Sequence, residues 1–214
     1  MLTDVLNLYA SRWEFFIALT LQHLCIAGAA TALAVLIGLG LGIVMIECRR
    51  AINPVNSLVN LFYTIPSISL LGLLIPFSGI GNATAVIALT IYGLLPMVRG
   101  TYAGISGIAP EVIEAAVGMG TTRAQMIWKI KIPAALLGII AALRITVVMT
   151  IALTGIASFI GAGGLGVAIY RGITTNNMAM TVAGSLLIAL MALFFDFALG
   201  RLERHIRNKR RLEA

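Results

Sequence analysis

Five long apolar runs, separated by short polar segments, constrain this chain more than any other feature of its sequence. The runs cover residues 24–46, 57–76, 83–98, 134–159 and 182–199. An apolar stretch of about 20 residues is the length that an α-helix needs to cross a bilayer. Because hydrophobic residues make up 60% of the chain and charged residues 11%, too few charges remain for a soluble domain of this length. The pattern predicts an all-α membrane protein with five transmembrane helices.

Basic residues are gathered on one side of this predicted membrane domain. That side holds the segment after the first run, the polar segment before the fourth run and the C-terminal tail, whereas the other side keeps Arg12 and Arg171. The positive-inside rule makes the basic side cytoplasmic. Five crossings then place the N-terminus outside and the C-terminus in the cytoplasm. Since topology accounts for the net charge of +7, the expected partner is the lipid bilayer and not nucleic acid.

The chain divides into three predicted parts around the runs. We expect an extracytoplasmic or interfacial lead-in at 1–23, one transmembrane domain at 24–199 and a basic cytoplasmic tail at 200–214. The lead-in has no basic stretch followed by a small-residue cleavage site, so it does not predict a cleaved signal peptide. Cys25 and Cys48 fall at opposite ends of one run and predict no disulfide framework.

A polar, glycine-broken segment at 101–133 interrupts the transmembrane domain on the cytoplasmic side. A short helix is predicted over 111–119, and Gly120 permits a sharp turn after it. Thr122 and Gln125 have the spacing of a capping box, which predicts that a second short helix starts there at an angle to the first. Two such helices would form a rigid projection that fits a groove on a partner.

A second glycine-rich string follows the fourth run and contains Gly161, Gly163, Gly164 and Gly166. It matches the GxGxxG spacing of dinucleotide-binding loops, but that site requires a preceding strand and an acidic residue about 20 positions on. Here an apolar helix is expected before it, and no acidic residue follows until Asp196. The glycines instead predict a tight turn at the outer mouth of the membrane domain.

Arg144 lies deep in the fourth run, where an unpaired charge is unfavourable. Its guanidinium could line a solute path through the membrane, or it could pair with Asp196 or Glu47. It could also hydrogen-bond to backbone carbonyls that are freed where helices kink. We favour a structural ion pair for Arg144, with the partner left open between the two carboxylates. Asp196, near the inner interface, is expected to be an ion-pair partner and not a proton carrier. Polar residues within the runs that could line a path are Tyr63, Ser67, Ser69 and Tyr92.

Gly38 and Gly42 form a GxxxG pattern in the first run. Small residues four apart let two helices approach closely in lipid. The same pattern also occurs in a permissive apolar helix that has no partner at that face. The sequence leaves both interpretations open.

The chain has no constellation of catalytic or metal-binding residues. No Ser/His/Asp set, paired carboxylates, HExxH or Cys/His metal spacing is present, and nothing matches the phosphate-binding pattern GxxxxGK[ST]. We therefore predict that the chain is not an enzyme and binds no cofactor or metal of its own.

The polar segment carries a family resemblance on Glu114, Ala115, Ala116 and Gly120, followed by Ile130 and Ile132-Pro133. This spacing resembles the cytoplasmic EAA loop of permease subunits from bacterial ATP-binding-cassette (ABC) importers, with Ile132 where the family usually has Leu. The resemblance implies a type I ABC importer permease fold. It also implies that a separate ATPase subunit, which holds ATP and magnesium, docks on the loop at Glu114, Ala115, Ala116, Gly120 and Thr122.

Further strings resemble the osmoprotectant permeases for glycine betaine, carnitine and choline: residues 63–67, 95–102 and 157–161. The resemblance implies a permease in the bacterial inner membrane with a second permease (identical or paralogous), two ATPase subunits and an extracytoplasmic substrate-binding protein. A permease for methionine or another amino acid is the alternative within this class. A secondary transporter or channel working alone usually shows inverted repeats and ionisable residues within its spans, whereas this sequence has no evident symmetry and no acidic residue deep in a run. A membrane adaptor would not need the EAA spacing.

Overall fold

The computed structural model describes residues 2–212, with side chains described up to Lys209, and every regular element in that range is helical. The predicted helical class is thus confirmed. In chain order the elements are α1 (Leu2–Ser11), α2 (Trp13–Glu47), η1 (Arg49–Ala51), α3 (Ile52–Thr64), α4 (Ser67–Ser78), α5 (Asn82–Ser106), α6 (Pro110–Gly118), α7 (Arg123–Gln125), η2 (Met126–Lys131), α8 (Ile132–Ala157), η3 (Ser158–Ile160), α9 (Gly166–Thr174) and α10 (Met178–Leu212).

Four helical stretches in the described residues are long and apolar enough to cross a membrane: α2, α5, the run Arg123–Ile160 that contains α8, and α10. The second predicted run is instead a broken pair, because α3 and α4 are bent by 102°. The break follows from Pro66, which lacks an N–H and pushes Ile65 into an extended conformation (φ −69°, ψ 128°). The pair makes a fifth crossing when it is counted as one span.

Several helices run beyond the predicted limits of the apolar runs. The helix α2 begins at Trp13 and not at residue 24, since Phe16 and Leu19 are buried and prolong its packing face. At the other end of the chain, α10 continues through the predicted tail as a helix. The side chains of Arg210 and Arg211, and residues 213–214, lie outside the described part of that tail.

The lead-in contains a helix of its own, α1, which packs on α10. Its Tyr9 hydroxyl donates a 2.8 Å hydrogen bond to the carbonyl of Ala183, and Val5 is buried at the same contact. Burial raises the pKa of Tyr9 above its usual value, so the phenol keeps the proton that it donates.

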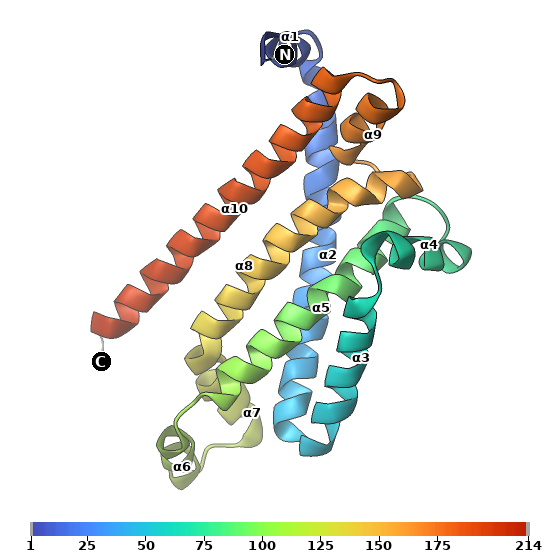
Figure 1. Cartoon of the computed structure of the whole chain (residues 1–214). Coiled ribbons are helices and arrows are strands. Elements are labelled where there is room, and N and C mark those ends of the chain that lie inside the picture. Colours follow the sequence, from blue (N-terminus) through green and yellow to red (C-terminus); the bar gives the residue numbers. More distant parts are fainter. Residues whose placement is uncertain (1, 213–214) are drawn as a thin grey trace.

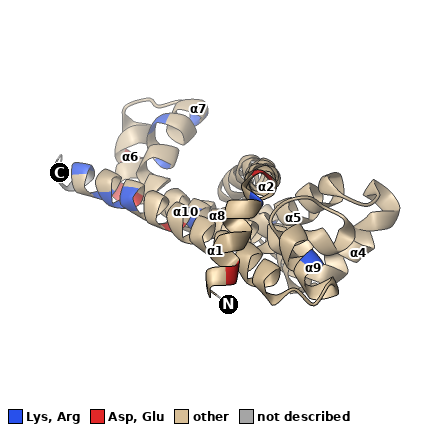
Figure 2. Ribbon diagram, turned by 90° about the horizontal axis from the view of Figure 1, so that it is seen from above, with Lys and Arg blue, Asp and Glu red and all other residues tan. Residues whose placement is uncertain are grey.

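The helix α5 packs on both α2 and α8 and has the largest share of buried residues among the described helices long enough to cross a membrane (Figure 1). The N-terminus and α9 lie at one end of the molecule, whereas α6, α7 and the C-terminus lie at the other end. Seen from above, Lys and Arg are concentrated around α7 and the C-terminal turns of α10 (Figure 2). The end with α6 and α7 is therefore the more basic one.

The packing of α2 on α5 uses the GxxxG glycines. A Cβ atom on Gly38 would lie 2.5 Å from the Cβ of Met97, and one on Gly42 would lie 2.6 Å from the Cβ of Thr101. Gly100 makes the same kind of approach from α5 to Ala142 of α8. Of the two interpretations left open by the sequence, the close helix pair is the one observed.

Gly38 and Gly40 provide a matched test of this packing, because a Cβ on Gly40 would meet nothing within 4 Å. We expect Gly38→Ala to lower the free energy of unfolding by about 1–3 kcal/mol through overpacking. Gly40→Ala should leave it unchanged or raise it by up to about 1 kcal/mol, because alanine favours the helix. Denaturation in detergent micelles measures both; equal effects of the two variants would contradict the close packing.

Candidate functional site

The polar segment begins with α6, which ends in a turn that Gly120 makes possible. Gly120 has φ +74°, in the left-handed region that favours glycine. Its N–H donates to the carbonyl of Val117 at 2.9 Å, and the N–H of Thr121 donates to the carbonyl of Ala116 at 3.2 Å. These two bonds form a Schellman motif, which closes the helix and fixes the direction of the chain after it.

The predicted capping box follows this turn and is confirmed. The backbone N–H of Gln125 donates to the Thr122 hydroxyl at 3.3 Å, and the N–H of Thr122 donates to the Gln125 side-chain oxygen at 3.0 Å. The helix that starts here does not end, however, as the two-helix prediction requires. It passes through a π-helix at Met126–Lys131 directly into α8. A π-turn widens the helix just before Pro133, where a proline ring would otherwise collide with the preceding turn.

The predicted coupling residues lie on the surface of this segment, with one exception. Glu114, Ala115, Gly120 and Thr122 are exposed, whereas Ala116 is 2% exposed and anchors α6. Between and beside the exposed residues the segment also presents large apolar side chains, which the sequence analysis did not single out: Val117, Met119 and Trp128 are 62%, 78% and 67% exposed. Exposed apolar side chains in a polar segment indicate a protein contact surface. The sequence did contain a signal for this contact surface, because Met119 and Trp128 are large apolar residues within a segment expected to be polar.

An ion pair connects the same segment to the end of α2. The Lys131 ammonium donates to a carboxylate oxygen of Glu47 at 2.6 Å, and the Lys131 side chain is 15% exposed. Glu47 was one of the two partners considered for Arg144, and that pairing is not observed. The segment is thus held to two long helices, to α8 through the backbone and to α2 through this pair.

The glycine-rich turn at the other end of the molecule is held by side chains from α2 and α5. Two of its glycines have left-handed φ values, +77° at Gly161 and +95° at Gly164. The N–H of Gly163 donates to the Asn82 side-chain oxygen at 2.8 Å, and that of Gly164 donates to the Gln22 side-chain oxygen at 3.3 Å. Gly166 is required by space, since a Cβ there would lie 2.0 Å from the carbonyl oxygen of Gly155. These contacts attach the turn to α2, α5 and α8.

His23 is a further anchor of this turn that the sequence analysis did not single out. Its side chain is fully buried, and Nδ1 accepts a 3.2 Å hydrogen bond from the N–H of Leu165. The ring proton therefore lies on Nε2, which donates to the carbonyl of Ile151 at 2.9 Å. The partners are 142 and 128 residues away in sequence, so no local pattern could reveal them.

Replacing His23 with leucine should destabilise the turn, because the buried N–H of Leu165 would lose its acceptor. We expect His23→Leu to lower the free energy of unfolding by about 1–3 kcal/mol. Leu21→Ala, an exposed position on the same helix, serves as the control and should change it by less than about 0.5 kcal/mol. Denaturation in detergent measures both, and a stable His23→Leu variant would contradict the anchoring role.

The predicted path residues are only partly brought together. Tyr63, Ser67 and Tyr92 line one cavity of about 320 Å³ beside the break at Pro66. Ser69 is exposed and does not line that cavity. The sequence suggested these residues by polarity alone, and the bend between α3 and α4 is what places three of them together.

Arg144 and Asp196 form a bidentate ion pair between α8 and α10. Arg144 donates from Nε to Asp196 Oδ1 at 2.6 Å and from Nη2 to Oδ2 at 2.7 Å. Glu203 lies 3.8 Å from Nη1 of the same guanidinium. The three residues line a cavity of about 650 Å³ together with Tyr63 and apolar side chains of α8. The guanidinium thus faces the cavity with its charge paired.

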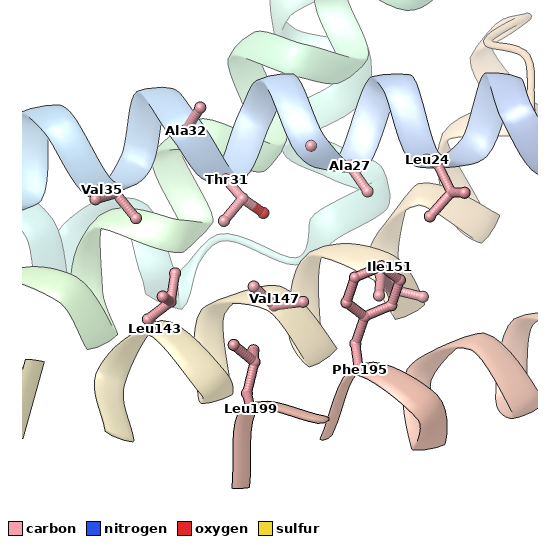
Figure 3. A pocket seen from close by; sticks show the side chains of 11 residues that line it. Leu24, Ala27, Thr31, Ala32, Val35, Leu143, Val147, Ile151, Phe195 and Leu199 are labelled. Carbon is pink, nitrogen blue, oxygen red and sulfur yellow. The ribbon is translucent and has the colours of Figure 1, made fainter. Parts of the chain in front are cut away.

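A third cavity, of about 360 Å³, lies between α2, α8 and α10 (Figure 3). Its lining is almost entirely apolar: Leu24, Ala27, Gly28, Thr31, Ala32, Val35, Leu143, Val147, Ile151, Phe195 and Leu199. Thr31 supplies the single polar side chain. Since selective sites orient a polar ligand with several placed polar groups, this cavity is unsuited to a hydrophilic solute. Among the residues that the structure describes, no cluster of His, Cys, Asp or Glu could hold a metal ion.

The fold and these features define a multi-pass membrane protein with a polar, partly apolar-surfaced segment at its basic end. Comparison with known families gives its membership. Residues 34–208 match the family described as binding-protein-dependent transport system inner membrane component, and the chain belongs to this family. It is therefore a multi-pass protein of the inner membrane and a transport component, not a catalytic enzyme. This confirms the resemblance and the location expected from the sequence.

Individual relatives cover most of the chain. It is 39% identical over 205 residues to the osmoprotectant import permease protein OsmW of Salmonella typhimurium, covering 94% of this chain and 95% of that one. It is 38% identical to the glycine betaine/carnitine/choline transport system permease protein OpuCD of Bacillus subtilis, covering 86% of this chain and 80% of that one. A third relative, the ergothioneine transport permease/ergothioneine binding protein EgtU of Helicobacter pylori, is 45% identical over 70% of this chain and 27% of that longer protein.

Among solved structures, the inward-facing MetNI methionine ABC transporter has a chain with the same fold. The TM-score is 0.82 at 26% sequence identity, and the match covers 89% of this chain and 95% of that one. The likeness extends over most of the chain, so the helical arrangement is that of an ABC importer permease.

Proposed function

We propose that the chain is the permease subunit of an ATP-driven importer of osmoprotectants, of the glycine betaine, carnitine and choline type. The observation that carries the proposal is the 39% identity to an osmoprotectant import permease across nearly the full length of both chains. Carnitine, choline, glycine betaine and ergothioneine all contain a trimethylammonium group. The relatives with these names therefore share a solute chemistry, and we assign that class to this chain.

In this proposal a separate ATPase docks on the segment from α6 to η2. The exposed residues Glu114, Ala115, Gly120 and Thr122, with the apolar side chains beside them, form the contact surface, and Ala116 holds α6 beneath it. The continuity of the segment with α8 and the Lys131–Glu47 ion pair support a mechanical role, because displacement of the segment would move two long helices together. ATP and magnesium belong to that partner subunit.

Two permeases, identical or paralogous, would assemble with two ATPase subunits and an extracytoplasmic binding protein. The end with α6, α7 and the C-terminus is then cytoplasmic, in agreement with its basic residues, and the N-terminus lies outside after five crossings. Closure of the ATPases would turn the permeases from inward-facing to outward-facing. The binding protein would release its solute at the outer mouth beside Gly161, Gly163, Gly164 and Gly166, and the hydrogen bonds of this turn to α2 and α5 support a fixed docking edge.

A methionine or other amino-acid importer is the second candidate, favoured by the shared fold with a methionine transporter. At 26% identity that likeness concerns the fold, whereas the osmoprotectant relatives are closer in sequence. Co-purification of this chain from its native membrane, with mass spectrometry of the bound subunits, tests the proposed assembly. We expect an ATPase and a binding protein, and calorimetry of that binding protein should show affinity for choline, carnitine, glycine betaine or ergothioneine. Affinity for methionine alone would replace the solute class.

A further inference from the structure

The cavity beside the break at Pro66 has an aromatic wall that the linear sequence did not reveal. Tyr63, in the last turn of α3, and Tyr92, on α5, have ring centroids 6.0 Å apart and planes at 66°. Both rings line the cavity of about 320 Å³, together with Ser67, Met149 and Leu153. Its volume is at the lower end of the range of about 300–1,000 Å³ found for small-molecule sites.

The two tyrosines have different roles in this wall. Tyr92 is 6% exposed, and its hydroxyl donates to the carbonyl of Ile65, which lies at the helix break. It therefore positions the break and supports the neighbouring ring. Tyr63 is 43% exposed, and an edge-to-face contact with Tyr92 occupies at most one face of its ring. Tyr63 accordingly has a π face available to a solute in the cavity.

Charge near the cavity is compatible with a cation. The cavity shares Tyr63 and Met149 with the adjoining cavity of about 650 Å³, so the two are neighbours along α8. The charged residues that line them are one guanidinium, of Arg144, and two carboxylates, of Asp196 and Glu203. Since Asp196 binds the guanidinium in a bidentate pair, no unpaired positive charge faces a cationic group there.

We propose that this cavity is where the permease itself holds the quaternary ammonium group of its solute during passage, with the ring of Tyr63 as the cation–π partner. The proposal rests on the proposed function and adds a binding site to it. A trimethylammonium group cannot donate hydrogen bonds, so an aromatic face is the recognition element that suits its chemistry. The polarisable thioether of Met149 lines the same space and adapts to a bulky apolar cation.

The test is uptake of radiolabelled choline and glycine betaine by the complete importer in proteoliposomes. Tyr63→Phe keeps the π face and should keep most of the wild-type rate, whereas Tyr63→Leu should lower kcat/KM for uptake by about tenfold. Tyr170→Leu is the matched control, because Tyr170 is 42% exposed, also lies edge-to-face with a phenylalanine and lines neither cavity. It should transport like wild type.

Stepwise fluorination of a phenylalanine at position 63 separates a cation–π contact from a packing role, because fluorine weakens the π face with little change in shape. We expect the logarithm of kcat/KM to fall steadily with each added fluorine, at unchanged ATPase activity and melting temperature. A flat series, or a Tyr63→Leu variant that transports like wild type, would overturn this inference while the proposed function stands. Failure of the wild-type importer to take up any trimethylammonium solute would refute the proposed function, and the inference with it.

Discussion

Replacing Gly120 with tryptophan is expected to abolish ATP-driven uptake and to release the ATPase from the permease. The left-handed φ of +74° disfavours any other residue by about 1–2 kcal/mol. The larger effect comes from the indole, which would project from the exposed turn between Ala116 and Thr122, where the proposed ATPase surface must fit. Co-purification of the ATPase and solute uptake should both fall at least about tenfold, which corresponds to about 1.4 kcal/mol of binding free energy.

Two controls separate the bulk of the side chain from backbone strain. Gly120→Ala introduces the strain without the bulk and should keep most of the bound ATPase. Gly118→Ala changes an exposed helical glycine two residues away, where a Cβ would meet nothing within 4 Å, and should behave as wild type. A Gly120→Trp variant that retains its ATPase and its uptake would contradict the proposed docking surface.

Breaking the Arg144–Asp196 pair is expected to be the most damaging change within the membrane domain. Arg144→Met leaves the Asp196 carboxylate without its bidentate donor, and Asp196→Leu leaves the guanidinium unpaired at the cavity wall. An unpaired charge at such a position destabilises the folded state. Replacing both partners with apolar residues removes both charges and therefore this destabilisation. Each single variant should therefore melt at a clearly lower temperature in detergent, and the Arg144→Met/Asp196→Leu double variant should recover most of the loss.

The i,i+4 pair between Glu203 and Arg207 offers a contrast on the same helix. The Arg207 side chain is 50% exposed, and exposed pairs contribute little to stability. Arg207→Met should leave the melting temperature almost unchanged. If the Arg144 and Asp196 single variants also melt like wild type, or if their effects simply add in the double variant, the pair has no structural role.

The features that could be predicted from the sequence are local ones. Hydropathy gave the apolar runs, and the spacing of Thr122 and Gln125 gave the capping box, because each depends on a few neighbouring residues. Gly120 was expected to turn the chain for the same reason, and its positive φ agrees. The prediction of a separate second helix was wrong because a π-turn before Pro133 lets α7 continue directly into α8.

What could not be predicted depends on tertiary contact. A proline such as Pro66 favours a break in a helix, but the bend of 102° and the meeting of Tyr63 with Tyr92 require the packing of α3 and α4 on α5. The role of His23 could not be found from neighbouring residues, since its partners come from the fourth run and the turn after it. Sequence polarity likewise grouped Ser69 with Tyr63, Ser67 and Tyr92, whereas Ser69 is exposed and does not line the cavity that the other three share.

The central claim is that this chain moves trimethylammonium solutes by the work of a partner ATPase. The most direct measurement is accumulation of radiolabelled glycine betaine and choline in proteoliposomes that contain the complete importer, with the binding protein outside and ATP or ADP inside. The account predicts accumulation against the gradient with ATP, none with ADP, and competition by carnitine but not by methionine. Equal uptake with ATP and ADP, or ATP-driven accumulation of methionine in place of these solutes, would contradict it.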